Sequence, residues 1–139
     1  METVSVVIVE HGGNWLPWAR KLRASRDRLV VVAQTECEAP HAFARRVIGR
    51  LKALRHEGVH LAEAALVGGT VSDSSHKHQR SKILRKLTAL LSHCGCEGHL
   101  YLDPGAEVDQ PSQNLMHAIA WALRDLTRGS GVSISVGLT

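Results

Sequence analysis

The chain has 139 residues, of which 44% are hydrophobic, and a formal net charge of +4 at neutral pH. This length suits a single domain, residues 1–139, whose core needs neither disulfides nor a metal. Its apolar runs fall short of the ~20 residues of a membrane helix, and residues 1–3 lack the basic charge that begins a signal peptide, so we expect a cytoplasmic protein without membrane contact.

The first predicted elements are two buried strands on either side of a short helix. Residues 4–9 form an unbroken and largely β-branched apolar run, which is typical of a central strand in a parallel sheet. A helix is expected over residues 14–25, with Asn14 as its cap and a buried stripe of Trp15, Trp18, Ala19 and Leu22. Residues 28–34 repeat the pattern of a buried strand.

The middle of the chain predicts two helices on either side of a more polar strand. Pro40 begins the first helix, Gly58 supplies the left-handed residue that ends it, and its buried stripe is Phe43, Val47, Leu51 and Leu54. Polar residues interrupt the strand at 59–67, which therefore resembles an edge strand. A helix follows over residues 74–95.

The last third of the chain completes an alternating pattern of strands and helices. It predicts a strand at 98–103, a helix that Ser112 caps and Gly129 follows, and an alternating strand at 132–136. Strands and helices in strict alternation predict an α/β fold, a three-layer sandwich with a five-stranded parallel sheet.

Two spatial orders of the strands remain open, 3-2-1-4-5 and the flavodoxin-like 2-1-3-4-5. The second strand is uniformly apolar, whereas the third and fifth contain polar residues, which sheets tolerate best at their edges. This contrast favours the order 3-2-1-4-5.

In the favoured order a crevice opens at the carboxyl ends of the first and fourth strands, where parallel sheets bind ligands. The candidate ligand-binding residues at this crevice are Glu10, His11, Gly12, Gly13, Gln34, Asp103 and Gly105. Thr35 and the Gly68-Gly69 turn would form its other wall.

The segment Val7-Ile8-Val9-Glu10 resembles the universal stress protein family, in which an apolar first strand typically ends in Asp. The length of the chain, its element order and the favoured strand order resemble that family too. Many members bind ATP through this acid, through residues after the second strand and through a Gly-x-x-Gly loop after the fourth. The corresponding loop here, residues 103–112, has a single glycine, Gly105, and so lacks the Gly-x-x-Gly pair; it contains Glu107 and Asp109, which would repel a polyphosphate. The resemblance therefore implies a member that binds no ATP, or binds it differently.

A candidate anion site lies at the start of the helix predicted over 74–95, which contains no carboxylate. Cations near a helix N-terminus oppose the helix dipole unless an anion lies nearby. The residues of this candidate site are Gly68, Gly69, Ser74, Ser75, Lys77 and Arg80. The alternative is a solvated basic helix that Asp73 caps.

The histidines and cysteines do not predict a metal site. His93, Cys94, Cys96 and His99 lie close together, but structural zinc sites use separated Cys-x-x-Cys pairs and no second pair is present. The odd number of cysteines fits a reducing compartment. We assign no metal, and the sequence names no cofactor.

The candidate homodimer interface consists of Trp121, Val132, Ile134 and Val136. Helical periodicity places Trp121 nearly opposite the buried stripe of its helix, and an exposed tryptophan often marks an interface. The last strand, if it lies at an edge, can pair with its copy. The alternative is a tryptophan that lies flat over neighbouring side chains.

No Walker loop, nucleophile elbow or zincin motif is present, so we do not favour an enzyme. The few aromatic residues argue against a nucleic-acid partner. The leading hypothesis is a homodimeric binding or regulatory protein of universal stress type, whose ligand is a nucleotide or another anionic small molecule. The alternatives are a hydrolase or transferase that uses Glu10, His11 and Asp103, and an interaction module without a ligand.

Overall fold

The computed structural model describes residues 2–23, 28–69, 98–104, 110–126, 128–129 and 133–136. In chain order the elements are β1 (Thr3–Val9), α1 (Leu16–Arg23), β2 (Arg28–Ala33), α2 (Pro40–His56), β3 (His60–Val67), β4 (His99–Asp103), α4 (Gln110–Leu126) and β5 (Ser133–Val136). The helix predicted over residues 74–95 lies outside the described residues. The other predicted elements are all present, with small shifts at their ends.

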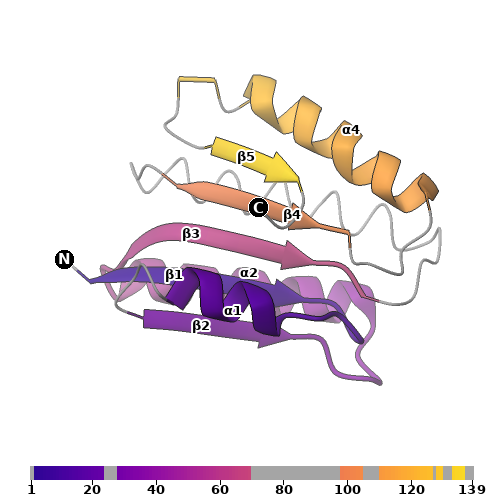
Figure 1. Cartoon of the computed structure of the whole chain (residues 1–139). Coiled ribbons are helices and arrows are strands. Elements are labelled where there is room, and N and C mark those ends of the chain that lie inside the picture. The colour runs from indigo at the N-terminus through magenta and orange to yellow at the C-terminus, as the bar shows by residue number, and fades with distance from the viewer. Residues whose placement is uncertain are drawn as a thin grey trace.

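The five strands form one sheet in the order β2-β1-β3-β4-β5, and every neighbouring pair is parallel (Figure 1). The predicted α/β class and five-stranded parallel sheet are confirmed, but the favoured order 3-2-1-4-5 is wrong and the flavodoxin-like alternative is correct. One face of β2, with Val30 and Val32, is buried, whereas Val31 on the other face is 37% exposed, so the apolar sequence of β2 does not reflect a central position. The polar residues of β3, His60 and Glu63, lie in the first half of a strand whose remainder is buried.

Two hydrophobic clusters lie on opposite faces of the sheet. On one face, α2 and α4 cover a cluster that includes the even-numbered residues of β1 and Leu100 and Leu102 of β4, and the largest side chain in this cluster is Phe43. On the other face, Trp18 and Leu22 of α1 pack against Val7 and Val9. The helices α1 and α2 therefore lie on opposite sides of the sheet, as the predicted sandwich requires (Figure 1).

The helices follow their predicted apolar stripes with differences at the ends. Helix α1 begins at Leu16, so Trp15 precedes it and is 38% exposed, although we predicted that it was buried. Helix α2 has the predicted stripe, and Gly58 follows it with a φ of 77°. Helix α4 begins at Gln110, before the predicted cap. Among the described helices, none is long and apolar enough to cross a membrane.

An arginine covers one outward-facing carbonyl group at each edge of the sheet. The amide of Gln34 donates to the Val9 carbonyl over 2.8 Å, so the peptide groups of the alternate residues Leu29, Val31 and Ala33 point away from β1. Arg46 of α2 donates to the Ala33 carbonyl. On β5, Ser133 faces β4, and the outward carbonyl of Ile134 accepts a hydrogen bond of 3.2 Å from Arg124 of α4. Such contacts hinder pairing with a further strand.

Candidate functional site

Three glycines pack the loops after β1, β3 and β4 into backbone contact at the carboxyl edge of the sheet. A Cβ on Gly68 would lie 2.6 Å from the Pro104 carbonyl oxygen, and one on Gly13 would lie 2.9 Å from the Gly68 carbonyl oxygen. A Cβ on Gly69 would overlap the carbonyl oxygen of His11. Because β3 lies between β1 and β4, its Gly68-Gly69 turn fills the space in which we predicted a crevice.

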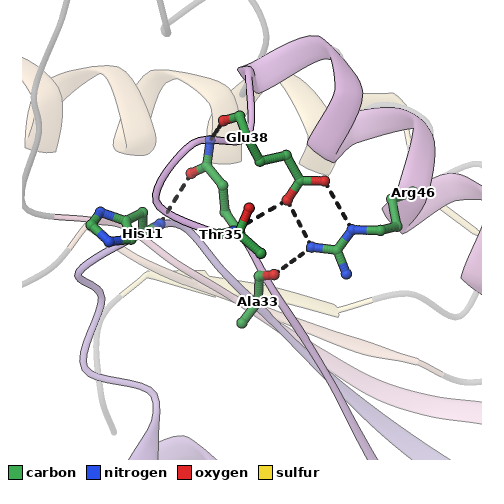
Figure 2. Close-up of polar contacts among 6 residues, drawn as sticks. His11, Ala33, Thr35, Glu38 and Arg46 are labelled. Carbon is green, nitrogen blue, oxygen red and sulfur yellow. Dashed lines mark hydrogen bonds and ion pairs between the residues drawn. The ribbon is translucent and has the colours of Figure 1, made fainter.

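The loop after β2 is held in a defined conformation by hydrogen bonds (Figure 2). The Gln34 side chain accepts from the His11 amide over 3.0 Å and donates to the Glu38 carbonyl over 3.0 Å, so it joins the β1 and β2 loops. The Thr35 amide donates to the Glu38 carboxylate over 3.2 Å, and the Glu38 amide donates to the Thr35 carbonyl over 3.1 Å. The chain between Thr35 and Glu38 is therefore a closed turn.

Arg46 fixes this turn to helix α2. Its Nε and Nη2 atoms donate to the two oxygens of Glu38 over 2.9 and 2.8 Å, and Nη2 also donates to the Ala33 carbonyl (Figure 2). The hydrogen bonds from Arg46 lower the pKa of Glu38 from its ordinary value, and those same bonds raise the pKa of Arg46. Glu38 is therefore an ionised carboxylate whose two oxygens both have a partner.

Between the β1 and β2 loops lies a pocket of about 290 Å³, which we call the β1–β2 pocket. Its volume is at the lower end of the range for small-molecule sites, roughly 300–1,000 Å³. Its lining comprises Glu10, His11, Gln34, Glu36, Cys37, Glu38, Ala39, Pro40 and Gly69. Three of the seven ligand-binding residues predicted from the sequence line this pocket: Glu10, His11 and Gln34.

Most of the charged groups that line the β1–β2 pocket are hydrogen-bond acceptors. Three carboxylates line it, and its lining contains neither lysine nor arginine. Helix α2 begins beside it with no side-chain cap at Ala39, so the first-turn amides of His41 and Ala42 lack acceptors within the helix. The exposed thiol of Cys37 also lines the pocket. A ligand with several donors and one acceptor would match this arrangement.

Asp103 does not line the β1–β2 pocket, although we predicted that it would lie with Glu10. Its carboxylate accepts a hydrogen bond of 2.5 Å from Nε1 of Trp18, on the face of the sheet that α1 covers. There the Lys21 ammonium lies 5.2 Å from the Trp18 ring and 4.6 Å from the Tyr101 ring. The structure therefore does not assemble Glu10, His11 and Asp103 into one catalytic group.

The remaining predicted site residues lie in the loops at the carboxyl edge, outside the described residues, or on α4 and β5. Gly12 adopts a φ of 83° in the turn after β1, and Gly13, Gly68 and Gly69 pack the loops together. Gly105, Ser74, Ser75, Lys77, Arg80 and Val132 lie outside the described residues. Trp121 is 67% exposed as predicted, whereas Ile134 is buried; Val136 ends β5. The part of the chain that the structure describes holds no cluster of His, Cys, Asp or Glu suited to a metal ion.

The sequence reasoning missed the part of the site between Glu36 and Pro40. These residues follow β2, and the carboxyl ends of neighbouring parallel strands lie at the same edge of a sheet. That rule pointed to Gln34 and Thr35 but did not show how far the loop after β2 continues along the pocket. The signal available in the sequence was the helix start at Pro40, which places the intervening turn next to β1.

The chain matches no protein-family model, no curated protein and no solved structure.

Proposed function

We propose that this protein is a small-molecule-binding protein whose ligand occupies the β1–β2 pocket and carries hydroxyl or amino groups, as a nucleoside does. The observation that supports this proposal is a pocket at the carboxyl ends of two parallel strands whose lining contains three carboxylates, one of them paired with Arg46, and neither lysine nor arginine. Carboxylates accept hydrogen bonds from hydroxyl and amino groups but repel phosphates.

The position of the pocket in the fold supports the same proposal. In the order 2-1-3-4-5 the chain reverses direction across the sheet between β1 and β3, and α/β proteins bind ligands at this switch point. Glu10 and His11 follow β1, and Gly69 follows β3, so the pocket begins at the switch point. The hydrogen bonds of Gln34 and Arg46 hold its second wall before any ligand arrives, which reduces the entropy cost of binding.

The nucleotide expected from the sequence remains part of this proposal in a restricted form. We propose that the pocket binds the nucleoside portion and that each added phosphate weakens binding, because Glu10 and Glu36 would face it. A regulatory protein of universal stress type also remains a proposal. Length and element order support it, whereas the observed strand order removes one of the similarities on which it was based.

Calorimetric titration with adenosine, AMP, ADP and ATP tests the proposed function. We expect adenosine to bind most tightly and ATP least tightly. Glu10→Gln should weaken adenosine binding about 10- to 100-fold, the usual effect of losing a hydrogen bond to a charged group. The matched control is Asp125→Asn, which removes an exposed carboxylate on α4.

Alkylation of Cys37 gives an independent readout of occupancy. A bound ligand should slow the reaction of this pocket thiol, and peptide mass analysis distinguishes it from Cys94 and Cys96. Tighter binding of ATP than of adenosine, or binding that leaves Cys37 alkylation unchanged, would contradict the proposed ligand class or its location.

We also propose a homodimer that contacts through the exposed face of α4. Trp121 is 67% exposed, and the guanidinium of Arg124 lies 5.4 Å from its ring. Because Arg124 also holds the outward carbonyl of Ile134, we expect side-chain packing rather than pairing of β5 strands. Sedimentation should give twice the mass of the chain for the wild type and the single mass for Trp121→Ala; unchanged mass in the variant would exclude this contact.

A further inference from the structure

A second concave surface, which shares no lining residue with the β1–β2 pocket, lies between α1 and the edge strand β2. This α1–β2 groove has a volume of about 590 Å³ and is lined by Trp15, Leu16, Ala19, Arg20, Arg23, Arg28, Leu29 and Val31. Trp15, Leu16 and Val31 are exposed by 38%, 47% and 37%. Large apolar side chains gathered in one hollow indicate an interaction surface more strongly than the same side chains scattered singly.

Unpaired backbone groups run along the same groove. The peptide groups of Leu29 and Val31 point away from β1, and no described residue forms a hydrogen bond with them. Figure 1 shows β2 at the edge of the sheet, with no described strand beyond it. An edge strand with open amides and carbonyls can accept an extended peptide as an additional strand. Arg46 occupies the next outward carbonyl, that of Ala33, so the open part of the edge ends there.

The charge of the groove restricts the partner. Three arginines and no carboxylate line it. Arg28 has an ion pair of 3.2 Å with Glu57, whereas Arg20 and Arg23 have no carboxylate partner among the described residues. A second copy of this chain would bring the same arginines toward one another, which is unfavourable. An acidic segment would pair with them instead.

We propose that the α1–β2 groove binds an extended, acidic and apolar segment of another protein, which adds a strand beside Leu29 and Val31. Alternate side chains of the added strand would contact Trp15, Leu16 and Val31 in the groove, and its carboxylates would reach Arg20 and Arg23. This binding is independent of the small-molecule function proposed above, because the groove and the β1–β2 pocket share no lining residue.

Fluorescence anisotropy tests this proposal with the labelled hexapeptide Val-Thr-Glu-Thr-Val-Thr, in which the valine and glutamate side chains lie on the same face of the strand. The comparison peptide has lysine in place of the glutamate. We expect the glutamate peptide to bind and the lysine peptide not to bind. The affinity of the glutamate peptide should fall as salt screens the arginines. No binding of the glutamate peptide up to about 1 mM, or equal binding of both peptides, would overturn the proposal.

Two variants locate the binding site. Arg20→Gln/Arg23→Gln should weaken binding about 3- to 30-fold, as expected for two exposed ion pairs. Its matched control, Arg45→Gln/Arg55→Gln, removes two exposed arginines of α2 and should bind like the wild type. Equal binding by the two double variants would overturn the assignment to this groove.

Val31→Pro tests the role of the strand edge. It removes an amide that points away from β1, so the hydrogen bonds between β1 and β2 stay intact. It should abolish peptide binding while the urea unfolding midpoint stays near that of the wild type; if the variant unfolds, the arginine variants still decide. A wild-type dimer that Val31→Pro converts to a monomer would show that a second copy occupies the groove, and would overturn the proposal.

Discussion

Replacing Gly68 by alanine should destabilise the protein, because the added Cβ meets backbone atoms rather than a flexible side chain. It would lie 2.6 Å from the Pro104 carbonyl oxygen and 3.0 Å from the attached carbon. The Gly68 amide is also held by a hydrogen bond of 2.6 Å to the Asp103 carbonyl. Ordinary contact begins near 3.4 Å, so the two segments must separate by about 0.8 Å.

The expected loss follows from two opposing effects. Overpacking of this kind costs about 1–3 kcal/mol. The reduced freedom of alanine in the unfolded chain offsets about 0.4–1 kcal/mol of that cost. The free energy of unfolding of Gly68→Ala should therefore be lower than that of the wild type by about 1.3 kcal/mol at the mid-points of these ranges, and by at most about 2.6 kcal/mol.

Urea unfolding followed by circular dichroism measures this difference, provided that the slope m is unchanged. The matched control is Gly49→Ala in α2, where a Cβ meets nothing within 4 Å. Removal of an exposed helical glycine should raise the free energy of unfolding by about 0.5–1 kcal/mol. A Gly68→Ala protein as stable as the wild type, beside a stabilised Gly49→Ala protein, would refute the close packing of the β3 and β4 loops.

Three further predictions concern single side chains. The pKa of Glu38 is lowered mainly by its hydrogen bonds with Arg46, so Glu38→Gln should lose about 1 kcal/mol of stability at neutral pH. This difference between variant and wild type should disappear as the pH falls below about 4.3, where the wild-type carboxylate becomes protonated, and urea midpoints measured across this range test it. Burial lowers the pKa of His99, and nearby Lys21 adds to this effect while Glu63 opposes it. Stability should therefore fall as the pH decreases below about 6.5, and His99→Gln should have a flatter pH profile; an unchanged profile would exclude this histidine as the cause. The buried hydroxyl of Ser5 has no hydrogen-bond partner among the described residues, so Ser5→Ala should raise the free energy of unfolding by about 1 kcal/mol in thermal denaturation, and a decrease would reveal a partner.

Local sequence patterns predicted the elements of this fold but not the order of its strands. Helix α2 starts at Pro40 and buries Phe43 and Leu51 as its periodicity predicts, because these features depend on residues within a few turns of one another. Strand order depends on which strand lies beside β1, and the apolar run of β2 does not contain that information. The edge strand β2 is as apolar as a central strand although Val31 is 37% exposed, so an apolar run does not distinguish the two positions.

The error in strand order accounts for the error in the predicted site. With β3 beside β1, Gly69 packs against His11, and Asp103 is displaced toward Trp18. The rule that ligands bind at the carboxyl edge of a parallel sheet still selected Glu10 and Gln34, because β1 and β2 are neighbours in either order. The turn between Thr35 and Glu38 could not be predicted, since the Arg46 contact that holds it joins residues whose spacing belongs to no known motif.

The arginine at each edge of the sheet also affects how copies of this protein can assemble. Edge-to-edge pairing that used both β2 and β5 would join copies head to tail, and such a contact does not close unless the rotation happens to form a ring. Arg124 occupies the outward carbonyl of Ile134 in short β5, whereas the outward peptide groups of Leu29 and Val31 in β2 have no hydrogen-bond partner among the described residues. If only one edge of the sheet can pair, two copies can join through that edge, but no third copy can be added to form a filament. Mutation of Arg124, which frees the outward carbonyl of Ile134, should thus expose this protein to fibre growth.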